Sequence, residues 1–335
     1  MALLNNLRIV EIGKKIMHFV SKNVSEKQRD FMNNLRRLSL KKLKKREYPS
    51  KQLFIMVFDG TFIQGGLADR LKGIVSGFHY CLCNNIDFRI KHTYPFEFSD
   101  YLLPNEYDWT IKPSDKVSYH LLETKYAYFM GEPLFERLTK LLNTKKQIHC
   151  YANWDTVAEL NTYYQTNYQW GELFKKLFNP ASEIERQIDH YKKQIGGEYI
   201  ACQFRFLALL GDFNELDKPT LAKHDQQVLI KKCLNALTEL KNKYNFPILV
   251  TSDSITFTSL AAKMEDVYTL PGKPVHIDYV KDVNNHEHIK TFIDFFMLSE
   301  AKKVYNIFTK EMYQSQFSQY AAKLNNIPFE RILIE

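Results

Sequence analysis

Residues 52–71 read QLFIMVFDGTFIQGGLADRL. From Leu53 to Phe58 the residues form an unbroken apolar run, which is typical of a strand buried on both faces. Apolar residues then recur at helical spacing from Leu67 to Leu82, and a second strand is expected at 86–90. A strand, a loop, a helix and a strand in this order predict the opening unit of a doubly wound α/β domain.

A second region of regular alternation follows Gly196-Gly197. Its patterns predict a parallel sheet with helices on both faces. The expected strands are 199–206, 247–252, 267–270, 303–308 and 329–334, and the expected helices are 226–244, 257–264, 288–301 and 313–324. Ligands of open α/β sheets bind beyond the carboxyl ends of the strands, so the loops at that edge hold the candidate site.

The composition suits packed globular domains. The chain has 335 residues, of which 45% are hydrophobic. Its five cysteines show no disulfide spacing, which favours a reducing, cytoplasmic setting. We expect no membrane-spanning segment and no secretory signal, because no apolar run is long enough for either.

The positive charge is concentrated at the N-terminus. Residues 1–46 contain 13 lysines and arginines against three acidic residues, whereas the rest of the chain has 33 basic and 35 acidic residues. This distribution argues against a nucleic-acid-binding body. Residues 1–48 are expected to form a basic amphipathic helical arm. It either packs on the protein as a solvated helix or lies peripherally on the anionic inner face of the membrane.

Arg205 is the main candidate for chemistry. It lies near the carboxyl end of the expected strand 199–206, on the same face as Gln203. A guanidinium among apolar residues needs an anion, because an unpaired buried charge is very costly. The anion is either a buried carboxylate, for which Asp253 is the candidate, or a diphosphate held by the guanidinium fork.

Further candidates flank the expected strand ends. Gly65 and Gly66 precede a helix, where backbone N–H groups favour anions, although a flexible turn explains them equally well. Ser315 and Gln316 begin the expected last helix, either as phosphate ligands or as N-caps. Asp253 could contact a purine base or ribose, or cap the helix that follows.

Four short motifs resemble those of the fucosyltransferase superfamily. Residues 203–206, QFRF, resemble the Gln-x-Arg strand of plant xyloglucan fucosyltransferases. They are also similar to the His-x-Arg strand of protein O-fucosyltransferases, α-1,6-fucosyltransferases and bacterial nodulation fucosyltransferases. Residues 66–71, GLADRL, resemble the Gly-Leu-Gly-Asn-Arg-Leu loop of these relatives. Residues 314–318, QSQFS, and 250–254, VTSDS, resemble their Ser-Ser-x-Phe loop and their Thr-Asp strand end.

The resemblance implies a GT-B-like fold with two facing Rossmann-like domains, 49–195 on the acceptor side and 196–335 for the nucleotide sugar. It implies GDP-fucose as donor, with Arg205 on the diphosphate, and inverting transfer to a glycan acceptor. The candidate donor-binding residues are Gly65, Gly66, Arg70, Gln203, Arg205, Asp253, Ser315 and Gln316.

The sequence contains no Asp-x-Asp pair, the usual device for holding Mg²⁺ or Mn²⁺ between donor phosphates. We therefore expect no metal cofactor, and we expect Arg205 to stabilise the leaving diphosphate. A carboxylate could serve as general base. The candidates are Asp212 first, then Asp69, with Asp59, Glu215 and Asp217 behind them. Two other functions remain open: a transferase for another nucleotide sugar, or a non-catalytic membrane-attached protein that binds a glycan or nucleotide.

Overall fold

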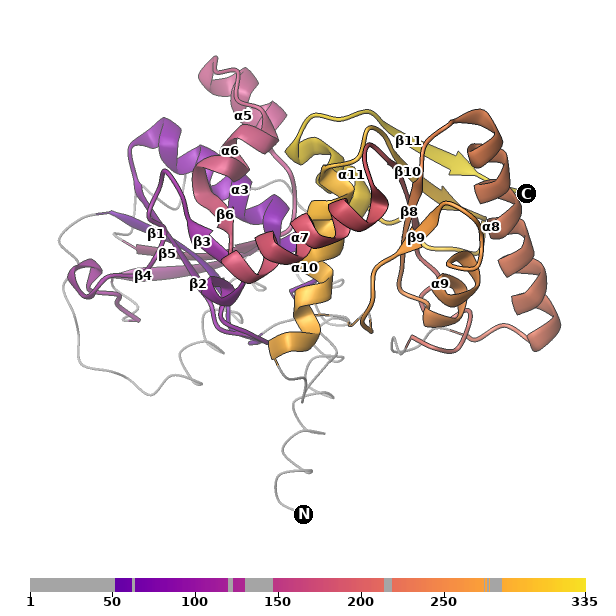
Figure 1. Ribbon diagram of the computed structural model, residues 1–335. Helices are drawn as coiled ribbons and strands as arrows, with labels where there is room; N and C mark the ends of the chain where they lie inside the picture. Colours follow the sequence, from indigo (N-terminus) through magenta and orange to yellow (C-terminus); the bar gives the residue numbers. More distant parts are fainter. Residues whose placement is uncertain are drawn as a thin grey trace. The chain divides into compact units, whose positions relative to one another are not determined.

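The computed structural model describes residues 52–61, 64–119, 123–129, 147–213, 219–273, 275, 277 and 285–335. They form two compact units (Figure 1). Unit 1 contains the described residues up to Glu97 and from Tyr107 to Tyr168, and unit 2 contains Phe98–Glu106 and Gln169–Glu335. The expected arm at 1–48 lies outside the described residues, as do Glu215 and Asp217.

Unit 1 is an α/β unit with a parallel sheet. Its main elements are β1 (Leu53–Phe58), α3 (Leu67–Asn84), β2 (Asp87–His92), β4 (Thr124–Phe129), β5 (Gln147–Ala152) and α5 (Val157–Tyr164). The strand order is β2-β1-β5-β4, and every residue of β1 is buried. A Cβ on Gly73 of α3 would lie 1.7 Å from the carbonyl oxygen of Ala152, so glycine lets the helix approach the end of β5. The expected strand, helix and strand are confirmed.

Unit 2 holds the second parallel sheet. Its main elements are β7 (Ile200–Phe204), α8 (Lys223–Lys243), β8 (Ile248–Ser252), α9 (Ile255–Ala261), β9 (Val267–Thr269), α10 (Asn285–Ser299), β10 (Val304–Phe308), α11 (Phe317–Leu324) and β11 (Phe329–Leu333). The strand order is β11-β10-β7-β8-β9. The alternation expected from the sequence is confirmed, and β7 is the central strand.

The two faces of the second sheet differ in polarity. Cys202, Phe204 and Val250 pack with α8 and α9 in one apolar core. Gln203 points to the opposite face, where α10 and α11 lie (Figure 1). On that face it is in register with Asn306 of β10 and Thr251 of β8. The face that carries polar side chains therefore continues to the carboxyl edge of the sheet, where Arg205 follows β7.

The boundary between the units differs from the expected position at 195/196. Residues 169–195 belong to unit 2, as α6 (Trp170–Leu177), β6 (Phe178–Pro180) and α7 (Ser182–Ile195). The physical reason is packing. The Trp170 ring lies 5.2 Å from that of Tyr320 in α11, and Phe174 contacts the Phe295 ring of α10. Residues 98–106 join unit 2 because β3 (Leu102–Pro104) pairs with β6.

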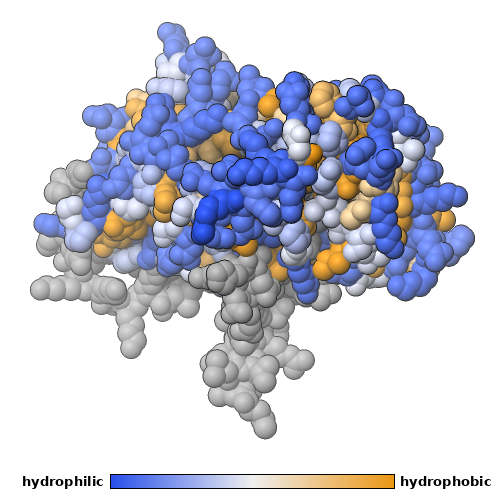
Figure 2. Space-filling model, viewed as in Figure 1, coloured by the Kyte–Doolittle hydropathy of each residue, from blue (hydrophilic) through white to orange (hydrophobic). Residues whose placement is uncertain are grey.

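The surface shows no continuous apolar face in the view of Figure 2, where hydrophobic residues are scattered among hydrophilic ones. Scattered apolar residues are ordinary on folded proteins and mark no docking surface. Among the described residues, no helix combines the length and apolar character needed to cross a bilayer.

Candidate functional site

The site is built at the carboxyl end of β7, where the chain turns around a buried carboxylate. Asp253, directly after β8, accepts hydrogen bonds from the backbone N–H groups of Phe206 (2.8 Å) and Leu207 (2.7 Å). Its Oδ2 also lies 3.3 Å from Nε of Arg205. Leu207 has φ of +54°, in the left-handed region. This conformation accompanies the wrapping of three successive residues around one carboxylate.

Asp253 is therefore the partner of Arg205, one of the two anions left open by the sequence. Only 1% of its side chain is exposed. Burial raises the pKa of the Asp253 carboxyl, while Arg205 and the N–H groups of Phe206 and Leu207 oppose the rise. The expectation that Asp253 contacts a base or ribose needs correction, because the carboxylate is turned into the protein. The helix-capping alternative is also wrong, since Ser254 is the N-cap of α9.

The guanidinium of Arg205 packs on an aromatic ring. Its central carbon lies 4.7 Å from the ring centroid of Phe213, which is buried. Arg205 itself keeps 21% of its side chain exposed. The site therefore holds a positive charge that reaches solvent between a carboxylate and an aromatic face.

Asp212, the first candidate for general base, connects the loop after β7 to the start of α9 through hydrogen bonds. Its Oδ2 accepts from the Ser254 hydroxyl (2.8 Å) and from the backbone N–H of Thr256 (2.7 Å). Ser254 in turn caps α9 by accepting from Phe257 N–H. The structure thus places this carboxylate in a capping network at the base of the loop.

Gln203 is buried, and its side chain is hydrogen-bonded to the start of α11. Its Oε1 accepts from the backbone N–H of Ser318 (3.2 Å) and from Nδ2 of Asn306 (3.4 Å). With 6% of the residue exposed, it positions the start of α11 rather than presenting an amide to a ligand. Its expected donor contact is corrected to this positioning role.

The loop between β10 and α11 lies beside Arg205. The N–H of Tyr313 donates to the carbonyl oxygen of Arg205 (3.2 Å). Ser315, one residue before the N-cap of α11, accepts from Phe317 N–H (3.1 Å). Gln316 is exposed at the N-cap position. The loop that carries Ser315 and Gln316 therefore lies at the same edge of the sheet as Arg205, at the start of α11.

A pocket of about 320 Å³ opens where β9 ends. Leu270 to Lys273 form one wall, and Tyr191 of α7 and Lys290 of α10 form others. The Lys290 ammonium is held by both carboxylate oxygens of Asp294, at 2.8 and 2.9 Å. Burial raises the pKa of the Asp294 carboxyl, and the nearby Lys290 ammonium opposes this rise. Nothing in the sequence pattern pointed to this pair, because lysine and aspartate four residues apart usually lie on a solvated helix face.

In unit 1 the glycine loop has the expected position before α3. Gly65 has φ of +70°, and a Cβ there would lie 2.7 Å from Oδ2 of Asp69. Gly66 is the N-cap residue of α3, and a Cβ added there would have no atom within 4 Å. Asp69 pairs with Lys72 at 2.7 Å and is 39% exposed. The loop can therefore approach a ligand, with one carboxylate beside it.

Arg70 is not part of that surface, which corrects its expected donor contact. It is fully buried, and its Nε donates to Gly65 O (3.1 Å). Its Nη1 donates to Tyr94 O (2.7 Å) and meets Nε2 of His92 at 2.7 Å. Nδ1 of His92 lies 2.9 Å from the carbonyl oxygen of Phe96, so Nδ1 carries the proton and Nε2 accepts. Arg70 holds the glycine loop against the end of β2.

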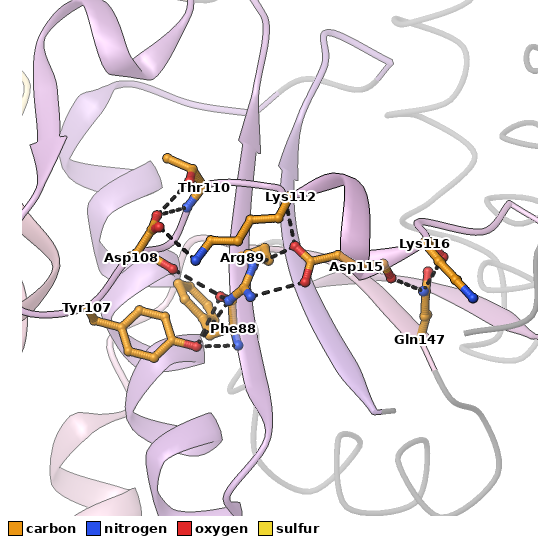
Figure 3. A network of polar contacts seen from close by, with 9 residues as sticks. All are labelled: Phe88, Arg89, Tyr107, Asp108, Thr110, Lys112, Asp115, Lys116 and Gln147. Carbon is orange, nitrogen blue, oxygen red and sulfur yellow. Dashed lines mark hydrogen bonds and ion pairs between the residues drawn. The ribbon is translucent and has the colours of Figure 1, made fainter. Parts of the chain in front are cut away.

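A second buried arginine in unit 1 has the same structural character. Figure 3 shows that Arg89 of β2 donates two hydrogen bonds to Asp115. They run from Nε to Oδ2 (2.8 Å) and from Nη2 to Oδ1 (3.1 Å). Tyr107 and the Phe88 carbonyl complete the shell around the guanidinium. Paired in this way, Arg89 stabilises the edge of the sheet and offers no ligand site.

Two residues of the site, Phe213 and Ser254, were not predicted from the sequence. Phe213 reads as an ordinary apolar loop residue, and its position under Arg205 follows only from the loop path. Ser254 was detectable, because serine before an apolar helical segment is a common N-cap. No group of three metal-ligating side chains occurs among the residues that the structure describes. All five cysteines lie among the described residues, and none of them forms a disulfide bond.

The fold is shared with solved fucosyltransferases. One is a mutant of Arabidopsis thaliana FUT1 in complex with GDP, 12% identical with a TM-score of 0.55, covering 95% of this chain and 77% of that chain. Another is NodZ α-1,6-fucosyltransferase soaked with GDP-fucose, 16% identical with a TM-score of 0.51, covering 82% and 93%. NodZ is from Bradyrhizobium. No protein-family model and no curated protein matches the sequence. The expected GT-B-like α/β class is confirmed, and the chain has the fold of the fucosyltransferases FUT1 and NodZ.

Proposed function

We propose that the protein is a glycosyltransferase that transfers fucose from GDP-fucose to a glycan hydroxyl. The observation that carries the proposal is Arg205, a partly exposed guanidinium at the carboxyl edge of the central strand, beside the start of α11. A guanidinium and a helix N-terminus together favour a diphosphate. The fold shared with FUT1 and NodZ supports the same donor class.

The pocket beyond β9 is proposed to receive the guanine base. Neighbouring strands are about 4.8 Å apart, so the ends of β7 and β9 are separated by roughly 10 Å, a distance that a nucleoside diphosphate can span. Lys290 lines the pocket and has a third N–H in addition to the two directed at Asp294. That donor matches the O6 acceptor of guanine, whereas adenine presents an amino group at the equivalent position.

The reaction is proposed to be inverting and independent of metal. The acceptor oxygen forms a bond to the anomeric carbon as the bond from that carbon to the β-phosphate oxygen breaks, and the acceptor proton passes to a carboxylate. Arg205 stabilises the charge that develops on the departing GDP. Of the two principal candidates for the base, Asp212 accepts hydrogen bonds from Ser254 and Thr256, and Asp69 is paired with Lys72 and 39% exposed.

For residues 1–46 we propose attachment to an anionic membrane surface, on the basis of their 13 basic residues. Sedimentation with vesicles containing phosphatidylserine tests this part separately. Binding that disappears in neutral vesicles or at high salt supports it, and equal binding to neutral vesicles contradicts it.

The donor is tested by calorimetry with GDP, UDP, ADP and CDP, in EDTA and in Mg²⁺. The proposal predicts that GDP binds most tightly and that EDTA leaves the affinity unchanged. Release of fucose or its transfer from GDP-fucose then establishes turnover. Preference for another nucleotide indicates a transferase of different donor specificity, and binding of none contradicts the proposal.

A further inference from the structure

The loop after β7 makes two contacts that have no part in the expected catalytic roles of Arg205 and Asp212. Asp212 is bonded to the start of α9, and the next residue, Phe213, supplies the ring beneath Arg205. Gly211, with φ of +78°, turns the chain immediately before them. Asp212 therefore holds the loop to α9, and the adjacent Phe213 lies against the guanidinium.

Arg205 is thus enclosed from two sides by groups of different chemistry. Asp253 meets its Nε, while the face of the guanidinium lies over the negative face of an aromatic ring. Phe213 is 5% exposed, so this contact is shielded from water, which strengthens it. A side chain with several rotatable bonds is held in one orientation before a ligand arrives, and such preorganisation improves affinity.

We infer that Phe213 and Asp212 are positioning residues for Arg205. Phe213 fixes the plane of the guanidinium, and Asp212 fixes Phe213 by anchoring the loop to Ser254 and Thr256. In this assignment Asp212 acts on the leaving diphosphate through Arg205 and not as the base for the acceptor. The inference rests on the proposed function and adds to it two residues that act at the donor side.

A double-mutant cycle on GDP affinity tests the inference. Phe213→Leu keeps an apolar side chain but removes the ring, and should weaken GDP binding roughly threefold to tenfold. Phe213→Tyr keeps the ring and should bind GDP like the unmodified protein. In an Arg205→Lys background, Phe213→Leu should have less than about a twofold further effect, because lysine has no planar guanidinium for the ring to orient. Melting temperatures show whether each variant is folded.

Asp212 is tested in the same cycle and by turnover. Asp212→Ala should weaken GDP binding in the Arg205 protein but not in the Arg205→Lys variant, and should leave kcat within about fivefold at saturating donor. A general base would show the reverse, a loss of kcat of roughly 10²–10⁴ with GDP affinity unchanged.

The outcomes separate this inference from the proposed function. Absence of GDP binding by the unmodified protein overturns both. Normal GDP binding, with effects of Phe213→Leu and Arg205→Lys that simply add, overturns the positioning role alone. If Phe213→Leu does not fold, the Asp212→Ala cycle still decides the question.

Discussion

Arg70 follows the glycine loop of the first sheet, and Arg205 follows the central strand of the second. Both were expected to contact the donor. The structure separates them. Arg70 is fully buried and directs its donors to Gly65 O, Tyr94 O and His92. Arg205 faces a carboxylate on one side and keeps 21% of its side chain exposed. An arginine in an apolar setting is therefore evidence for a partner, and only the fold shows whether that partner is the protein itself or a ligand.

The largest expected effect is on unit 1. Arg70→Met removes three hydrogen bonds, one to the buried His92 and two to the carbonyl oxygens of the partly buried Gly65 and Tyr94. A buried acceptor left without its donor costs about 1–3 kcal/mol. We expect the free energy of unfolding of unit 1 to fall by about 3–5 kcal/mol, measured by urea unfolding followed by tryptophan fluorescence. Arg186→Met, at a residue 75% exposed on α7, is the matched control and should change it by less than about 0.5 kcal/mol. A folded, stable Arg70→Met protein with weakened GDP binding would place Arg70 in the ligand site.

The next effect is a pH dependence confined to unit 1. Burial lowers the pKa of His79 from 6.5 to about 4, against a smaller opposing influence of Asp155. The unfolded chain therefore binds a proton more readily than the folded chain. Stability is complete above about pH 6.5, is lost as the pH falls towards 4, and should decrease by on the order of 2 kcal/mol. His79→Gln should flatten this dependence, and an unchanged slope in that variant would assign it to other groups.

The smallest expected effect concerns how unit 2 distinguishes guanine from adenine in the bound nucleotide. Replacing both Lys290→Met and Asp294→Leu removes the charge pair without leaving one charge buried alone, which is often near neutral for stability. Calorimetry should show the preference for GDP over ADP reduced by about tenfold, the equivalent of one charged hydrogen bond. Retention of the full preference for GDP over ADP would exclude Lys290 as the residue that distinguishes guanine from adenine.

The fold was predictable because its signals are local. The buried run at 53–58 and the alternation after Gly197 require only the period of apolar residues, and both are confirmed. The unit boundary was not predictable, because it depends on the packing of α6 and α7 against α11 and α10. Such contacts join residues more than 100 positions apart and leave no periodic trace.

The site divides in the same way. The rule that strand ends share an edge places Arg205 and the loop of Ser315 and Gln316 at one edge of the sheet, and their contact with a donor stays a prediction. The roles of Arg70, Gln203 and Asp212 could not be predicted, because burial and hydrogen-bond direction depend on how the loops turn. Asp253 as the partner of Arg205 was one of the two alternatives that the sequence left open. Leu207 illustrates the point: its left-handed backbone, rare for leucine, accompanies the inward turn of the Asp253 carboxylate.

The most direct test of the central claim is the affinity of Arg205→Lys for GDP. Lysine keeps the positive charge but loses the planar fork that matches a diphosphate. We expect the dissociation constant for GDP, measured by calorimetry, to rise at least about tenfold, since hydrogen bonds to charged groups contribute about 1.5–3 kcal/mol. The melting temperature should stay within about 2 °C. An unchanged affinity for GDP in the folded variant would contradict the assignment of Arg205 to the donor diphosphate.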